Sequence, residues 1–142
     1  MKAENISKVI RILKKETPGW GVPAVTLEAV TSHDPFRVLI STVLSLRTKD
    51  ETTADASGRL FALADNPGDM LGLSEREIAE AIYPVGFYRT KAKNILGICR
   101  ELIDKYRSRV PDDLEELLHL KGVGRKTANL VLTLGYGKHG IC

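Results

Sequence analysis

Residues 117–132 read LLHLKGVGRKTANLVL, a pattern that predicts two short helices joined by a tight turn. We expect the first helix to end near Leu118 and the second to begin around Arg125. The turn contains Gly122 and Gly124, which allow backbone conformations that other residues avoid. Glycines also let the backbone of the turn come close to another surface.

The start of the second helix has the chemistry of an anion site. Its first backbone N–H groups have no acceptor within the helix, and the helix dipole is positive at this end. Arg125, Lys126 and Thr127 add two cations and a hydroxyl beside those donors, and Val123 is the side chain that the turn can bury. A phosphate group is the natural ligand for this combination. A G-x-G turn can also be only a structural corner between helices.

The composition is that of one globular domain of ordinary size. The chain has 142 residues, 43% of them hydrophobic, and a formal net charge of +3. This balance is compatible with a nucleic-acid partner but does not establish one. No apolar run approaches the roughly 20 residues of a membrane span, and the charged N-terminus does not look like a secretory signal. Because no candidate membrane span is present, we expect no membrane partner. Cys99 and Cys142 form no C-x-x-C pair, so we expect a reducing, cytoplasmic setting.

Helical periodicity runs along the chain and no strand pattern is convincing, so we predict an all-α fold. We expect an amphipathic helix over 1–16 and a helical domain over 17–142. The two short helices and the tight turn between them occupy 113–135 of this domain. The segment from Phe36 to about Leu46 is apolar nearly all round, which is typical of a central buried helix. Asp34-Pro35 supplies its N-cap and a proline at the first helical position.

Further helices are expected at 51–64, 67–71, 75–82 and 88–107. Asp50 is expected to cap the first of these, with Leu63 on its inward side. Ser74 and Glu77 have the spacing of a capping box.

Two other segments place polar and aromatic residues beside helix ends. Residues 86–92 read GFYRTKA, in which Phe87 precedes the cations Arg89 and Lys91. Aromatic rings can stack on bases while cations contact phosphates, although Phe87 could equally be a core aromatic. Residues 86–110 carry seven Lys or Arg and two Asp or Glu, for which a solvated helix face is the ordinary explanation.

The second segment, residues 44–50, reads LSLRTKD and lies between two predicted helices. Its polar residues Arg47, Thr48 and Lys49 would therefore be presented on a loop.

Together the three segments resemble the endonuclease III family of DNA glycosylases. Residues 120–128 match the family's L-P-G-V-G-x-K-T-A hairpin pattern, except that Lys121 replaces the proline. Residues 86–92 match G-(L/F)-Y-x-x-K-A at each position. Residues 44–50 correspond to the last seven positions of L-L-S-x-Q-x-x-D, with Arg47 in place of the glutamine.

This resemblance implies an endonuclease III-like helical barrel that clamps damaged duplex DNA and rotates a damaged pyrimidine out of the stack. Lys126 matches the lysine that attacks C1′, forms an imine and cuts the strand by β-elimination. We expect Lys126 to be partly buried, and the protein to act as a monomer on DNA with a damaged pyrimidine or an abasic site. The expected DNA contacts are Arg47, Thr48, Lys49, Phe87, Arg89, Lys91, Gly122, Val123, Gly124, Arg125 and Thr127.

Part of the family pattern is missing. The sequence ends before the V-D-T-H segment, whose aspartate supports catalysis in the family, and before the four cysteines that hold a four-iron four-sulfur cluster. We therefore expect a truncated chain with no metal site of its own, weak base excision, and a cluster in the full-length protein. The alternative is a non-catalytic helix-hairpin-helix module that only grips DNA phosphates.

Overall fold

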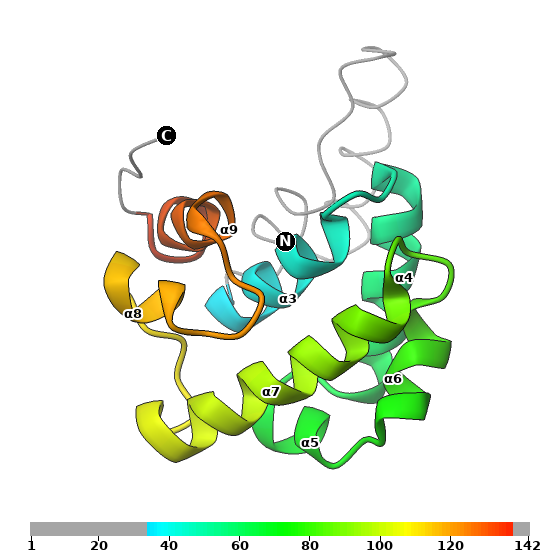
Figure 1. Ribbon diagram of the computed structural model, residues 1–142, viewed down its shortest axis with the longest axis horizontal. Coiled ribbons are helices and arrows are strands. Elements are labelled where there is room, and N and C mark those ends of the chain that lie inside the picture. Colours follow the sequence, from blue (N-terminus) through cyan, green and yellow to red (C-terminus); the bar gives the residue numbers. More distant parts are fainter. Residues whose placement is uncertain (1–33, 138–142) are drawn as a thin grey trace, which may run out of the picture.

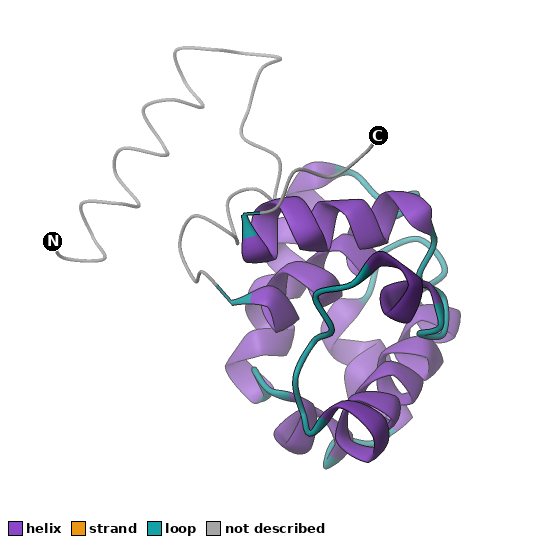
Figure 2. Ribbon diagram, turned by 90° about the vertical axis from the view of Figure 1, so that its left-hand side faces the viewer, coloured by secondary structure: helices purple, strands orange, loops and turns teal. Residues whose placement is uncertain are grey.

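The computed structural model describes residues 34–137, which fold into helices joined by loops, with no strand among them (Figures 1 and 2). The all-α prediction is confirmed for this part of the chain. The helix predicted at 1–16, the beginning of the domain predicted at 17–142, and Cys142 lie outside the described residues.

The helices are numbered as in Figure 1. Their bounds are α3 (Pro35–Ser45), α4 (Asp50–Leu63), α5 (Pro67–Leu71), α6 (Glu75–Ile82), α7 (Tyr88–Tyr106), α8 (Leu114–Leu118), α9 (Arg125–Leu130) and the π-helical turn η1 (Val131–Gly135) that continues α9.

Helix α3 is the centre of the fold. In Figure 1 it runs through the middle of the view, with α8 and α9 to one side and α4 and α6 to the other. It packs against α4, α7, α9 and η1. Eight of its residues are buried, and burying a side chain such as leucine or isoleucine contributes about 1.5–3 kcal/mol. The predicted start is confirmed, because the Asp34 carboxylate accepts a hydrogen bond from the Phe36 N–H at 3.0 Å, with Pro35 in the first turn.

Helix α7 forms the second support. Helices α5 and α6 both pack against it. Its buried residues have the spacing of one helical face and are Lys91, Ala92, Ile95, Ile98, Cys99 and Leu102.

Two predictions about helix ends can be compared directly. The capping box is confirmed: the Ser74 hydroxyl accepts from the Glu77 N–H, and the Ser74 N–H donates to the Glu77 carboxylate, both at 3.0 Å. Asp50 is not the N-cap of α4, because Lys49 occupies that position and Asp50 is the first helical residue. Its negative charge there still suits the positive end of the helix dipole.

The prediction that Leu63 faces inward is wrong. Its side chain is 55% exposed. The buried positions of this part of the chain are Ser57, Leu60, Phe61 and Ala64. They recur at intervals of three and four residues, and position 63 falls outside that stripe.

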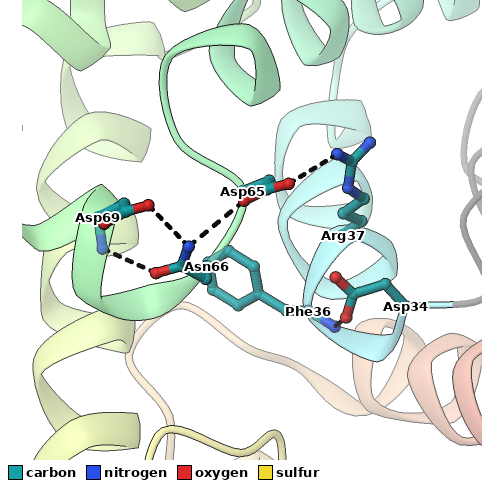
Figure 3. A network of polar contacts seen from close by, with 6 residues as sticks. All are labelled: Asp34, Phe36, Arg37, Asp65, Asn66 and Asp69. Atoms are coloured by element: carbon teal, nitrogen blue, oxygen red, sulfur yellow. Dashed lines mark hydrogen bonds and ion pairs between the residues drawn. The ribbon is translucent and has the colours of Figure 1, made fainter.

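A polar network holds the start of α3 against the turn between α4 and α5 (Figure 3). The Arg37 guanidinium donates to the Asp65 carboxylate at 3.1 Å and lies over the Phe61 ring, 5.0 Å from its centroid. This hydrogen bond lowers the pKa of Asp65. The Asn66 side chain accepts from the Asp69 N–H at 2.8 Å and so caps α5. The network fixes the N-terminal half of α3.

Candidate functional site

The helical hairpin begins and ends as the sequence predicts. Helix α8 ends at Leu118 and α9 begins at Arg125. Within the turn, the Val123 N–H donates to the Leu120 carbonyl at 3.1 Å, and the Val123 side chain is 7% exposed. Val123 is thus buried by the turn as expected, so any contact between this residue and a ligand would come from its backbone.

The two glycines of the hairpin have different structural roles. Gly122 has φ +76°, and a Cβ added there would lie 2.7 Å from Nδ2 of Asn94 on α7. Gly124 has φ −96° and ψ −179°, which is ordinary extended backbone, and an added Cβ would meet no atom within 4 Å. The expectation of a special conformation holds for Gly122 and is wrong for Gly124. The missing side chain of Gly124 instead leaves open surface beside the first N–H groups of α9.

The polar residues that open α9 divide between surface and interior. Arg125 and Lys126 are exposed. The expectation that Lys126 is partly buried is therefore wrong. Thr127 is 1% exposed, so its hydroxyl is not available on the surface.

Lys126 borders a hollow of about 510 Å³. The volume falls in the range of roughly 300–1,000 Å³ that is typical of small-molecule sites. Arg125, Asn129, Leu130 and Thr133 complete its described lining. An exposed amine next to a hollow of this size can reach a group that enters it.

A second group of candidate residues is formed by the loop after α3 and the turn before α7. The Gly86 N–H donates to the Thr48 hydroxyl at 2.8 Å. A Cβ on Gly86 would lie 2.5 Å from the Arg47 carbonyl oxygen, so only glycine allows the two backbones to approach this closely. The Arg47 guanidinium lies over the Phe87 ring, 5.6 Å from its centroid. The fold therefore brings two of the three predicted segments together.

Phe87 is an exposed residue and not part of the core. Its side chain is 62% exposed, which decides between the two interpretations that the sequence left open. Arg47, Lys49 and Arg89 are also exposed, whereas Thr48 is half-buried.

The expectation that Lys91 contacts DNA is wrong. This lysine was expected to present a cation to phosphates, but the residue is only 5% exposed. Its Nζ donates to the carbonyl of Leu44 at 3.0 Å, to the Thr48 hydroxyl at 3.2 Å and to the carbonyl of Leu46. Burial lowers the pKa of Lys91 to about 8.

A signal for this burial was present in the sequence. Lys91 stands four and seven residues before Ile95 and Ile98, which places it on the core face of α7. Helical periodicity, applied to the charged residue as well as to the apolar ones, would have found it.

The part of the chain that the structure describes offers no metal site. Residues 34–137 contain no group of three or more His, Cys, Asp or Glu side chains placed to hold a metal ion. Cys99 is buried, and burial raises the pKa of its thiol to about 12. A thiol held in its neutral form is a poor ligand for iron or zinc. Within the same residues, no helix has the length and apolar character needed to span a membrane.

The chain resembles a known family of DNA repair proteins over most of its length. Residues 40–139 match the HhH-GPD superfamily of base excision DNA repair proteins.

Curated relatives with similar sequences carry the name endonuclease III. The chain is 53% identical over 105 residues to endonuclease III of Thermotoga maritima, covering 74% of this chain and 49% of that protein. It is 36% identical over 137 residues to endonuclease III of Rickettsia conorii, covering 96% of this chain and 62% of that protein. The chain thus spans between 49% and 62% of the length of these two relatives.

Solved structures with the same arrangement of helices include two complexes with DNA. One is a trapped endonuclease III–DNA covalent intermediate with an estranged adenine, and the other is a non-covalent endonuclease III–DNA complex. Each is 34% identical to this chain with a TM-score of 0.73 and covers 96% of it. The chain covers 62% of the first protein and 61% of the second.

Proposed function

The chain belongs to the HhH-GPD superfamily of base excision DNA repair proteins, and from this premise we propose that it cuts duplex DNA at abasic sites and damaged pyrimidines through Lys126. The observation that carries the proposal is the position of this lysine. Its exposed amine stands at the start of α9, next to a hollow of about 510 Å³ and beside the open surface at Gly124.

The proposed reaction follows from the chemistry of an amine and a sugar. The lone pair of the neutral Lys126 amine attacks C1′ of the sugar. At a damaged pyrimidine the bond between C1′ and the base breaks, and the base leaves with the electron pair. At an abasic site the leaving group is water. The C1′–O4′ bond then opens, O4′ takes up the proton that the nitrogen releases, and an imine between Nζ and C1′ remains. This imine makes the proton at C2′ acidic, and its removal breaks the bond between C3′ and the 3′ phosphate oxygen, so that the phosphate leaves and the strand is cut by β-elimination.

The reacting sugar must leave the stack, because its C1′ cannot be reached inside a duplex. Open surface at Gly124 and the Arg125 guanidinium would hold the phosphate backbone near the hollow. The exposed Arg47–Phe87 pair would occupy the space that the displaced nucleotide leaves, with the ring stacked on a neighbouring base. The covalent and non-covalent DNA complexes of the similar endonuclease III structures support this interpretation.

A four-iron four-sulfur cluster belongs to the resemblance, but the described residues do not fit one. Their single free cysteine, Cys99, is buried and neutral. We therefore expect any ligands of such a cluster to lie outside residues 34–137, and we assign it no part in the reaction.

Borohydride trapping on a preformed abasic site tests the proposal. Borohydride reduces the imine to a stable amine, so the wild-type chain should become covalently attached to the DNA and migrate as a larger species on a denaturing gel. Lys126→Ala should abolish this adduct. Lys121→Ala removes another exposed lysine from the same hairpin and should leave the adduct intact.

An adduct of undiminished yield in Lys126→Ala would show that another amine reacts. A wild-type chain that forms no adduct, and that binds intact and abasic duplexes equally with strong salt dependence, would instead be a non-catalytic DNA-binding module.

A further inference from the structure

Lys91 carries a buried amine that the proposed reaction does not use. It is in the first turn of α7, and its Nζ reaches across to the end of α3. A cation in the first turn faces the positive end of its own helix dipole, which is unfavourable. Its burial also removes the ammonium from water. Both costs must be offset by the partners that surround it.

Those partners match an ammonium group well. The three N–H donors of Nζ meet three acceptors: the carbonyls of Leu44 and Leu46 and the Thr48 hydroxyl. Helix α3 ends at Ser45, so these two carbonyls are among those that a helix leaves without an acceptor role in its own ladder. A cation at a helix C-terminus is also favoured by the dipole of that helix. The pKa of about 8 leaves the group charged at neutral pH, with all three protons in place.

The Thr48 hydroxyl extends the contact to a third segment. It donates to the Leu46 carbonyl at 3.3 Å, and it accepts from Lys91 Nζ at 3.2 Å and from the Gly86 N–H at 2.8 Å. A hydroxyl has one donor and two acceptor sites, and here all are used. One side chain therefore joins the end of α3, the start of α7 and the turn before α7.

The residues next to this junction are Arg47 and Phe87. Both have φ 56°, in the left-handed region that non-glycine residues avoid. Such conformations persist only where the surrounding structure fixes them. The hydrogen-bonded residues Thr48 and Gly86 are the sequence neighbours of these two residues: Thr48 follows Arg47, and Gly86 precedes Phe87.

We propose that Lys91 is a positioning residue, which together with the Thr48 hydroxyl locks the loop after α3 to the turn before α7, so that Arg47 and Phe87 meet DNA as one rigid unit. This inference rests on the proposed contact between that pair and DNA. In this role Lys91 does not contact a phosphate. It acts instead by holding the exposed pair in shape.

The lock can be measured without DNA, by amide hydrogen exchange in the full 142-residue chain. The Gly86 N–H should be protected, because it donates to Thr48. Thr48→Val removes the hydroxyl and should speed its exchange about tenfold or more. Thr48→Ser keeps the hydroxyl and should retain the protection. Lys91→Met should also speed the exchange, whereas Lys105→Met, a charge removal at an exposed position in the last turn of the same helix, should not.

The effect on DNA is measured with the same variants on intact and abasic duplexes over a range of salt concentrations. Thr48→Val and Lys91→Met should each reduce the preference for abasic DNA about tenfold, since the stacking residue is no longer held in place. The slope of log K against log salt should not change, because no phosphate contact is lost. Removal of a phosphate contact would lower the slope by about 0.9.

Two results would overturn the inference. In one, Lys91→Met lowers the salt slope by about 0.9 and leaves Gly86 protected, so that Lys91 is a phosphate contact after all. In the other, Thr48→Val leaves both Gly86 protection and abasic preference as in the wild type. A wild-type chain without abasic preference would contradict the proposed function, while the exchange of Gly86 would still decide whether the lock exists.

Discussion

The guanidinium of Arg47 lies over the ring of Phe87, with 5.6 Å between the guanidinium carbon and the ring centroid. The two residues come from loops that are far apart in sequence, and each has a left-handed backbone. A cation over an aromatic face is stabilised by about 0.5–1 kcal/mol at an exposed site. The pair therefore offers, from a single place on the surface, a ring that can stack on a base and a guanidinium that can form hydrogen bonds to the edge of a base.

Phe87→Ala should weaken binding to abasic DNA without unfolding the protein. Stacking of a base on an aromatic side chain is worth about 1–3 kcal/mol, which corresponds to a roughly 5- to 150-fold loss of affinity. Because the ring is 62% exposed and its described contact is with the Arg47 guanidinium, the free energy of unfolding should fall by no more than about 1 kcal/mol. Fluorescence anisotropy and urea unfolding measure the two quantities.

Tyr83→Ala is the matched control for this prediction. Tyr83 is 59% exposed and lies edge-on to Tyr88, with 5.2 Å between ring centroids. Its removal should leave the affinity for abasic DNA nearly unchanged. Equal losses in the two variants would mean that Phe87 has no special role.

Arg47→Gln should change the response to the base opposite an abasic site. An arginine can form two hydrogen bonds to guanine, and such a pair discriminates by about 1–3 kcal/mol against the wrong base. We therefore expect the wild type to prefer guanine over adenine at that position, and Arg47→Gln to lose most of this preference. Competition binding with the two duplexes measures the ratio.

Lys49→Gln removes the same charge from the same loop and should weaken binding to both duplexes alike. A preference for guanine that survives Arg47→Gln would assign the discrimination to another residue.

Much of the fold could be predicted from the sequence because its signals are local. The Asp34 cap, the Ser74–Glu77 capping box and the hairpin boundaries each depend on a few neighbouring residues, and the structure confirms all of them. The exposed face of Phe87 could not be decided this way. Its exposure depends on which segments cover the turn, and both a core and a surface position fit the pattern.

The error at Lys91 has a different cause. Its charge indicated a surface position, whereas its place on the core face of α7 indicated burial. The acceptors that make burial possible come from the loop after α3 and have no signature in the neighbourhood of Lys91. A buried charge is tolerated only where such partners exist, and only the tertiary structure reveals them.

Gly122→Ala and Gly124→Ala should affect the free energy of unfolding differently, although the two positions are only two residues apart. At Gly122 the added methyl group would lie 2.7 Å from Asn94 Nδ2, with the backbone at φ +76°. We expect a loss of about 1–3 kcal/mol in the free energy of unfolding. At Gly124 the methyl group would enter open space, so stability should remain within about 0.5 kcal/mol of the wild type.

DNA binding separates the two variants further. Gly124→Ala should lower the affinity for DNA, since the methyl group stands where a phosphate would approach the first N–H groups of α9. Thermal unfolding followed by circular dichroism, together with anisotropy on one abasic duplex, measures both effects. A Gly124→Ala variant with wild-type affinity would place the phosphate elsewhere on the hairpin.

The buried amine of Lys91 makes stability depend on pH in a predictable direction. Burial lowers the pKa of Lys91 in the folded chain to about 8, from its ordinary value of 10.5. Between these values the unfolded chain still binds the proton that the folded chain has lost, so the free energy of unfolding rises with pH. The stabilisation that comes from the lowered pKa of Lys91 is complete above pH 10.5 and is lost as the pH falls through 8.

Lys91→Met removes this titration and keeps a side chain of similar length. Urea unfolding of both proteins between pH 7 and pH 10.5, at constant ionic strength, gives the difference in their free energies of unfolding. The difference should move in favour of the wild type as the pH rises through 8, because the groups around Nζ are carbonyls and a hydroxyl that do not titrate in this range. A difference that stays flat, or that moves toward the variant, would mean that the three acceptors hold the proton on Lys91 more strongly than burial expels it.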